Sequence, residues 1–230
     1  LPNTTLFLSN PFFSTKKESI NHKIRSIKSK PFQFKEFLIH QDKAAMKVGT
    51  DAVLLGAWCS LENYPNSILD IGAGTGIIAL MLAQRSETIT IDAVELDENA
   101  YEQCVNNFEL SDWSDRLFCF NASFEEFVDE MQDEEEKYDV IISNPPFYAD
   151  AFKTENEARN KARFTSSLTF KNLISGVSKI LSDSGEFSVI IPFKEEAGFI
   201  ETANQNNLFL NRSEERRVGK ECRIIGGRGD

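Results

Sequence analysis

The chain has 230 residues, 41% of them hydrophobic, and a formal net charge of −11 at pH 7. This length and composition fit one α/β domain with a sizeable core, and no apolar run approaches the roughly 20 residues of a membrane-spanning helix. The four cysteines and two histidines show no zinc spacing, so we expect reduced thiols, no metal and a cytoplasmic protein. The acidic charge argues against a nucleic-acid binder, because such proteins usually show a basic surface.

The N-terminal part divides into an irregular stretch and a predicted helix. Residues 1–29 are rich in Ser, Lys and Asn and show no sustained helix or strand period. We expect a flexible basic extension there, or translated upstream sequence. Residues 43–58 then predict a helix that precedes the sheet. The main domain is therefore expected to begin at residue 30.

A glycine loop follows the first predicted strand, residues 67–71. Gly72, Gly74 and Gly76 have the spacing G-x-G-x-G, not the G-x-G-x-x-G of dinucleotide folds. Glycines let a ligand approach the backbone, and open α/β sheets bind ligands at the carboxyl ends of their strands. With Asp70 before it, this tight loop suits an amino-acid-like, cationic ligand. The alternative is a glycine-rich turn without a ligand.

The second predicted strand, residues 89–95, ends in acidic residues. A carboxylate about twenty residues after a glycine loop can accept both hydroxyls of a ribose. Glu95 is the better candidate for this contact, because Asp97 precedes a helical pattern and is typical of an N-cap. The alternative for Glu95 is a solvated strand end.

The fourth predicted strand, residues 138–143, is followed by Asn144-Pro145-Pro146-Phe147. The two prolines fix φ and stiffen the turn. The Asn144 side-chain oxygen and the Pro145 carbonyl supply hydrogen-bond acceptors, and Phe147 offers a flat face on which a base can stack. This turn suits a planar nitrogen that carries an amino group. The alternative is an ordinary exit from a strand, where Asn and Pro are common.

The segment after this turn concentrates positive charge. Four cations lie within eleven residues: Lys153, Arg159, Lys161 and Arg163. Much of the acid lies instead in residues 125–136, so local patterning can present a basic rim beside the turn and an acidic surface elsewhere. The alternative is a loop of mixed charge with no partner.

Alternating strand and helix patterns predict an α/β fold, a doubly wound, mostly parallel sheet with helices on both faces. Further strands are expected over 117–121 and 186–191, and helices over 76–85, 97–109, 123–131, 168–182 and 194–206. Right-handed crossovers would bring the carboxyl ends of the first, second and fourth strands to one cleft.

The C-terminal segment differs from the rest of the chain. Residues 207–211 indicate the entry to a sixth strand, and Arg212–Arg223 then resembles the conceptual translation of a sequencing-library adapter. We expect residues 212–230 to be a non-native tail, or a disordered one at its Gly-rich end. The main domain would then span 30–211, and the C-terminal edge strands of the sheet would be missing.

Several segments resemble the bacterial tRNA1(Val) adenine-N6-methyltransferases, a class I S-adenosylmethionine-dependent family that carries the Asn-Pro-Pro-Phe motif. The resemblance runs from about Lys30 to Asn211 and is most specific at Lys47–Trp58. The other matching segments are 30–35, 40–43, 141–147 and 162–165. The members of this family modify the adenine just 3′ of the anticodon.

The resemblance implies a Rossmann-like, metal-independent monomer that moves a methyl group from S-adenosylmethionine to N6 of adenine 37 in tRNA1(Val), leaving S-adenosylhomocysteine. The implied catalytic residues are Asn144, Pro145 and Phe147. The implied cofactor contacts are Lys47, Thr50, Asp70, Gly72, Gly74, Gly76, Glu95, Leu96, Ser123 and Asn144. The implied RNA contacts are Tyr148, Lys153, Arg159, Lys161 and Arg163. Ser123 stands where many relatives place an Asp beside the cofactor adenine.

This chemistry demands placement of the acceptor and exclusion of water, not a strong base. Acceptance of both N6 hydrogens by Asn144 and the Pro145 carbonyl would direct the nitrogen lone pair at the methyl carbon. Phe147 or Tyr148 would stack on an adenine flipped out of the anticodon loop. Two rivals stay open: N-methylation of a ribosomal RNA guanine or a protein glutamine on the same fold, and a cofactor-binding protein without turnover.

Overall fold

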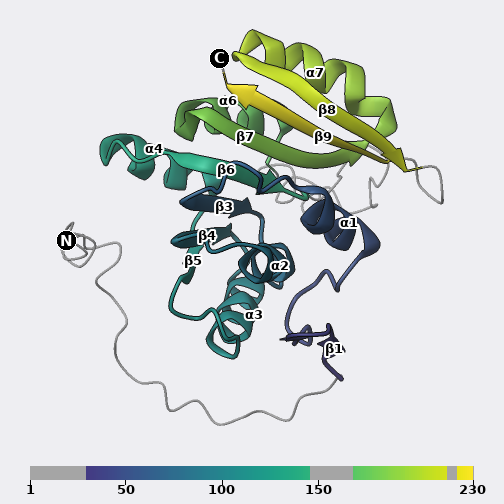
Figure 1. Cartoon of the computed structure of the whole chain (residues 1–230), viewed down its shortest axis with the longest axis vertical. Helices are drawn as coiled ribbons and strands as arrows, with labels where there is room; N and C mark the ends of the chain where they lie inside the picture. The colour runs from purple at the N-terminus through teal and green to yellow at the C-terminus, as the bar shows by residue number, and fades with distance from the viewer. Residues whose placement is uncertain (1–29, 146–167, 217–221, 230) are drawn as a thin grey trace, which may run out of the picture. The chain divides into compact units, whose positions relative to one another are not determined.

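The computed structural model describes residues 30–145, 168–216 and 222–229 (Figure 1). Every helix and strand of the described residues lies between residues 31 and 230. None of the helices in the described part of the chain is long and apolar enough to cross a membrane.

The centre of the fold is a seven-stranded sheet of order β5-β4-β3-β6-β7-β9-β8. Its strands are β3 (Ser67–Ile71), β4 (Thr90–Glu95), β5 (Leu117–Asn121), β6 (Tyr138–Ser143), β7 (Leu181–Pro192), β8 (Leu208–Arg216) and β9 (Cys222–Gly229). The first five are parallel, while β9 is antiparallel to both β7 and β8. The predicted doubly wound, mostly parallel sheet is confirmed.

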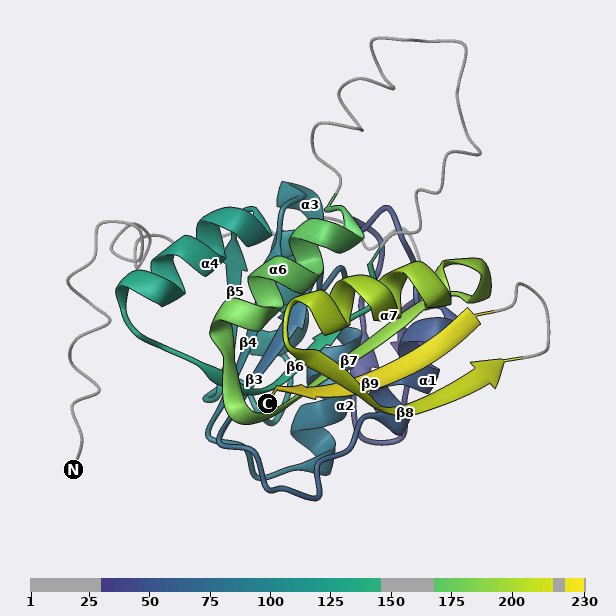
Figure 2. The ribbon, with the colours of Figure 1, turned by 90° about the horizontal axis from the view of Figure 1, so that it is seen from above.

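Helices cover both faces of this sheet, so most residues of its central strands are apolar and buried. They are α1 (Thr50–Trp58), α2 (Ile77–Arg85), α3 (Glu98–Glu109), α4 (Phe124–Asp133), α6 (Phe170–Ile180) and α7 (Glu196–Gln205), with a short 3-10 turn at Phe193–Glu195. One buried cluster joins α1, α2 and α3 to Ile68 of β3, and a second joins α4, α6 and α7 to Leu69. Seen from above, α4, α6 and α7 lie over one face of the sheet (Figure 2).

The first helix is shorter than the sequence predicts. Residues 43–58 were expected to be helical, but α1 begins at Thr50. The reason is that side chains bind the preceding backbone: the Lys43 N–H donates to Gln103 Oε1 at 3.0 Å and the Val48 N–H to Gln41 Oε1 at 3.0 Å. These donors are therefore satisfied without a helix.

Two predictions for the C-terminal part are wrong. The edge strands are present as β8 and β9, and the Gly-rich end is a strand through Gly229. Ile224 and Ile225 are buried, and the Arg212 guanidinium lies 3.8 Å from the Trp58 ring centroid while its Nη2 donates to Trp58 O at 2.7 Å. Two apolar residues in a basic, glycine-rich segment gave little strand signal. That residues 212–230 are foreign to the native protein stays a prediction.

A small two-stranded sheet precedes α1. It pairs β1 (Phe32–Gln33) with β2 (Leu38–Ile39), antiparallel, with Phe32 opposite Ile39. The sequence pattern did not indicate this hairpin, because each strand has only two residues. Among the described residues, it forms a sheet of its own, apart from the seven-stranded one.

Candidate active site

The register of the sheet brings several predicted residues to one edge. Ile71, at the end of β3, pairs with Val94 of β4 and with Ser143 of β6. The residues next in sequence after these paired positions therefore lie side by side, namely Gly72, Glu95 and Asn144. The Ser143 hydroxyl donates to Ile71 O at 3.0 Å and fixes two of these ends together.

The three glycines of the loop have different tasks. All have positive φ, at 72°, 58° and 76° for Gly72, Gly74 and Gly76, which favours glycine. A Cβ at Gly76 would lie 2.6 Å from the Phe108 ring and 2.8 Å from Cys104 Sγ, so this glycine permits close packing of α2 on α3. A Cβ at Gly72 or Gly74 would meet nothing within 4 Å. Those two glycines face open space that a ligand can fill.

Asp70 is fully buried beneath this loop. Its Oδ2 accepts the Ala79 N–H at 3.2 Å, while Oδ1 has no hydrogen-bond partner among the described residues. Burial raises the pKa of the Asp70 carboxyl to about 7, the charge of Glu95 adds to this rise, and the Ala79 N–H opposes it. A buried carboxyl with one free oxygen suits a cationic group of a ligand.

Glu95 already holds the glycine loop in place. Its Oε2 accepts the Gly74 N–H at 2.8 Å and its Oε1 accepts the Asp97 N–H at 2.9 Å. Each carboxylate oxygen can accept more than one hydrogen bond, so both keep capacity for a ribose hydroxyl. Leu96 is half exposed beside it. Asp97 caps α3 by accepting the Ala100 N–H, as predicted.

Ser123 has a clear structural task. Its hydroxyl and backbone N–H both bind Glu126 Oε2, and the Glu126 N–H binds Ser123 Oγ, which forms a complete capping box at the start of α4. Its expected contact with the cofactor adenine stays a prediction. Asn121, which the sequence did not single out, lies nearer the strand end, where its amide donates to Glu95 O and Leu96 O at 2.9 and 3.2 Å.

The Asn-Pro-Pro-Phe turn begins at this same edge. Asn144 is partly exposed directly after β6, and Pro145 is buried. The remaining predictions for this region lie outside the described residues: Phe147, Tyr148, Lys153, Arg159, Lys161 and Arg163.

Two buried polar side chains of α3, which sequence reasoning missed, tie the segment before α1 to the site. Asn107 Oδ1 accepts the His40 N–H at 2.9 Å, and its Nδ2 donates to His40 O at 2.9 Å and to Thr75 O at 2.8 Å. Gln103 accepts the Lys43 N–H. Lys47 and Thr50 are exposed at the end of this segment. Asn107 and Gln103 both lie on the face of α3 that packs against the protein core, and polar residues at such positions in the sequence could have indicated them.

Comparison with known proteins identifies the family of the chain. The profile of the family described as "Methyltransferase small domain" matches residues 49–197. The tRNA1(Val) (adenine(37)-N6)-methyltransferase of Christiangramia forsetii is 61% identical over 184 residues, covering 80% of this chain and 76% of that protein. The protein of the same name from Flavobacterium psychrophilum is 57% identical over 178 residues, covering 77% and 75%. The chain belongs to this methyltransferase family.

Solved structures support the fold alone. A putative SAM-dependent methyltransferase from Streptococcus mutans matches with a TM-score of 0.61 at 12% identity, over 83% of this chain and 52% of that one. This agreement confirms the Rossmann-like architecture.

The residues at the strand ends fit the methyltransferase cofactor, S-adenosylmethionine. Asp70 Oδ1 is a buried acceptor that no described residue binds, which suits the positive charge of this molecule. Gly72 and Gly74 leave room at the backbone, and Glu95 can accept from ribose hydroxyls. Within the described ranges, no group of three His, Cys, Asp or Glu side chains is placed to hold a metal ion.

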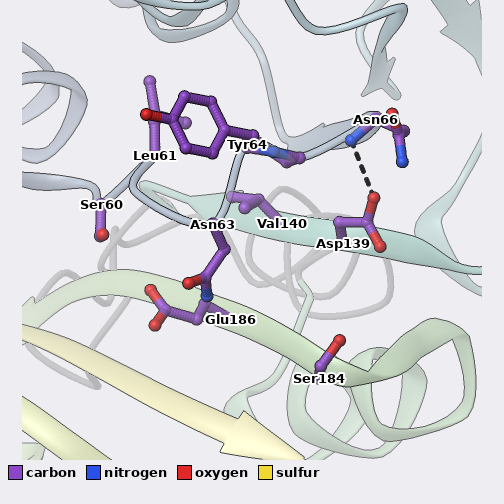
Figure 3. A pocket seen from close by; sticks show the side chains of 10 residues that line it. Ser60, Leu61, Asn63, Tyr64, Asn66, Asp139, Val140, Ser184 and Glu186 are labelled. Atoms are coloured by element: carbon purple, nitrogen blue, oxygen red, sulfur yellow. Dashed lines mark hydrogen bonds between the residues drawn. The ribbon is translucent and has the colours of Figure 1, made fainter.

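A cavity of about 210 Å³ lies at the opposite edge of the methyltransferase sheet (Figure 3). Its lining comes from the loop before β3 and the starts of β6 and β7, including Asn63, Tyr64, Asp139 and Glu186. The Asn66 N–H donates to Asp139 Oδ2 across it at 2.9 Å. Because it borders the amino ends of these strands, it is separate from the glycine loop and from Asn144.

Proposed function

We propose that this protein transfers a methyl group from S-adenosylmethionine to N6 of adenine 37 in tRNA1(Val). The observation that carries this proposal is the convergence of the glycine loop, Glu95 and Asn144 at one sheet edge, in a chain up to 61% identical to proteins of that name. Asn144 is followed by two prolines and an aromatic residue in this sequence, which suits an exocyclic amino group.

The chain's own residues position the acceptor. S-adenosylmethionine, when bound, supplies an activated methyl group. Asn144 Oδ1 and the Pro145 carbonyl would accept the two N6 hydrogens of the adenine and turn the nitrogen lone pair toward the cofactor side of the edge. Burial of Pro145 helps to keep water from this position. A proton can leave the nitrogen after transfer, so a strong general base is not required.

The finer features of the proposal concern the RNA and the cell. The valine isoacceptor is proposed from the names of the relatives. The protein is proposed to act as a monomer, because one anticodon loop needs only one active edge. It is also proposed to act in the cytoplasm. Lys153, Arg159, Lys161 and Arg163 are proposed to hold phosphates on the basis of sequence.

The purified protein incubated with radiolabelled S-adenosylmethionine and total tRNA from a strain lacking the gene tests this function. We expect label in N6-methyladenosine at position 37 of a valine tRNA. Label in a ribosomal RNA guanine or in a protein glutamine would replace the proposed substrate. Cofactor binding without label in any of these acceptors would support the alternative of a binding protein without turnover.

A further inference from the structure

The β1–β2 hairpin carries an unusual column of aromatic rings. The Phe37 ring is buried and packs edge-on against Trp113, with centroids 5.9 Å apart. Phe34 stacks on Phe37 at 4.6 Å and an interplanar angle of 12°, and Phe32 packs on Phe34 at 5.2 Å. The column runs from the core to the surface, where Phe32 is 44% exposed. The exposed ring of Phe32 is thus backed by a column of packed rings.

The end of this hairpin is linked to the glycine loop. His40 follows β2 directly, and the Asn107 side chain binds its N–H and its carbonyl as well as Thr75 O of the glycine loop. One buried side chain therefore joins the end of the hairpin to the cofactor loop. An RNA that places a flipped base at Asn144 has further nucleotides that lie away from this residue.

The chemistry of the exposed hairpin matches single-stranded RNA. Proteins bind unpaired nucleotides by stacking bases on aromatic rings and by placing cations at phosphates. Lys35 lies in the turn between Phe34 and Phe37, and its side chain is 91% exposed. Its ion pair with Glu36 at 3.5 Å is solvated on both sides and can therefore exchange for a phosphate at little cost. Lys35 therefore favours a partner that carries negative charge over an uncharged, apolar one.

We propose that the β1–β2 hairpin is a docking surface for the substrate RNA, on which an unpaired base outside the target stacks against Phe32 while Lys35 contacts the backbone. This inference rests on the proposed function and adds a second contact to it. The hairpin sets which RNA can present its adenine, and the edge at Asn144 performs the transfer.

Two substitutions of Phe32 and one matched control test the stacking. Phe32→Tyr keeps a flat ring, while Phe32→Leu keeps an apolar side chain without one. Leu38→Ala is the control, because Leu38 is 46% exposed on the same hairpin but points to its other face, given the pairing of Leu38 with Gln33. Binding of a fluorescent valine anticodon stem-loop RNA is measured by anisotropy with S-adenosylhomocysteine present. The kcat, the KM for tRNA and the melting temperature are measured alongside.

We expect Phe32→Leu to raise the Kd and KM for RNA about tenfold, while Phe32→Tyr and Leu38→Ala stay within about twofold of the wild type. The kcat at saturating tRNA should not change. Wild-type RNA affinity in Phe32→Leu would overturn the inference, as would equal losses in all three variants, which would indicate general damage to the hairpin. If the wild type fails to methylate tRNA, the proposed function fails, and the anisotropy series still decides whether Phe32 binds RNA.

Discussion

At the scale of single residues, Asp70 and Asn144 have different proposed roles, Asp70 toward the cofactor and Asn144 toward the adenine. Asp70 is buried, and its Oδ1 has no partner in the part of the chain that the structure describes. This is unfavourable until a cation or a proton occupies the site. Asn144 cannot change its charge, and its amide oxygen is available as an acceptor whatever the pH. Cofactor binding should therefore depend on pH through Asp70, and the recognition of the adenine amino group should not depend on pH through Asn144.

Asn144→Ala should keep cofactor affinity within about twofold and lower kcat by at least about a hundredfold, because it removes an acceptor that positions the adenine nitrogen. Calorimetry with S-adenosylmethionine and single-turnover methylation of tRNA separate the two effects. Asn144→Asp, which keeps the acceptor oxygen, is the matched variant and should retain more activity. Undiminished turnover in Asn144→Ala would remove this residue from the mechanism.

Cofactor affinity should rise as the pH increases through about 7. The sign follows from burial: the raised pKa keeps Asp70 largely neutral below about pH 7, and a cationic ligand binds the ionised form more tightly. Titrations at several pH values, in buffers with different ionisation enthalpies, would show proton release on binding at the acid end. Asp70→Asn should bind more weakly and lose this pH dependence. A variant that keeps the wild-type pH profile would contradict the assignment.

At the scale of elements, strand ends could be predicted and the connections between distant segments could not. The glycine loop, Glu95 and Asn144 stand at the ends of apolar runs, so their meeting follows from a parallel sheet. Asn107 looks like an ordinary polar residue of a helix, since its partner His40 is 67 residues away in sequence. The helix predicted from residue 43 is wrong for a related reason. Side chains bind the backbone of this segment, and the local sequence pattern does not indicate these hydrogen bonds.

The capping box of α4 gives a test at this scale. Ser123→Ala should lower the free energy of unfolding by about 1 kcal/mol, because the first turn of α4 loses a side-chain acceptor. Glu126→Ala removes the other side chain of the same capping box and is the control. The free energy of unfolding is measured by chemical denaturation. If Ser123 also contacts the cofactor, its substitution alone should weaken S-adenosylmethionine binding. Equal affinities in the two variants would leave Ser123 with the capping task only.

At the scale of the whole molecule, the raised pKa values of Asp70 and Asp92 make the protein less stable as the pH rises. Burial raises the pKa of Asp92 to about 7, although the hydrogen bond from Tyr138, at 2.6 Å, opposes the rise. A folded pKa above the unfolded value of 3.8 means that the stabilising contribution is complete below about pH 4 and lost by about pH 7. Asp70 acts in the same direction.

We expect the free energy of unfolding to fall between about pH 5 and 7, by at most about 1.4 kcal/mol per pH unit for each of these groups. Asp92→Asn keeps an acceptor for the Tyr138 hydroxyl but does not titrate, so its stability should fall less steeply. Urea denaturation at several pH values, compared between the wild type and this variant, checks the slope. Parallel curves would show that Asp92 does not contribute.

The order of the strands has a consequence for how the chain folds as it is synthesised. From β3 to β7, each new strand pairs with one already made: β4 with β3, β5 with β4, β6 with β3 and β7 with β6. β8 breaks this sequence, because β9, the strand that separates it from β7, is made afterwards. On the ribosome, β8 must wait unpaired or fold back as a hairpin with β9, and the edge of β7 stays open during that interval. The glycine loop, Glu95 and Asn144 all emerge before this step, so the cofactor could bind a nascent chain.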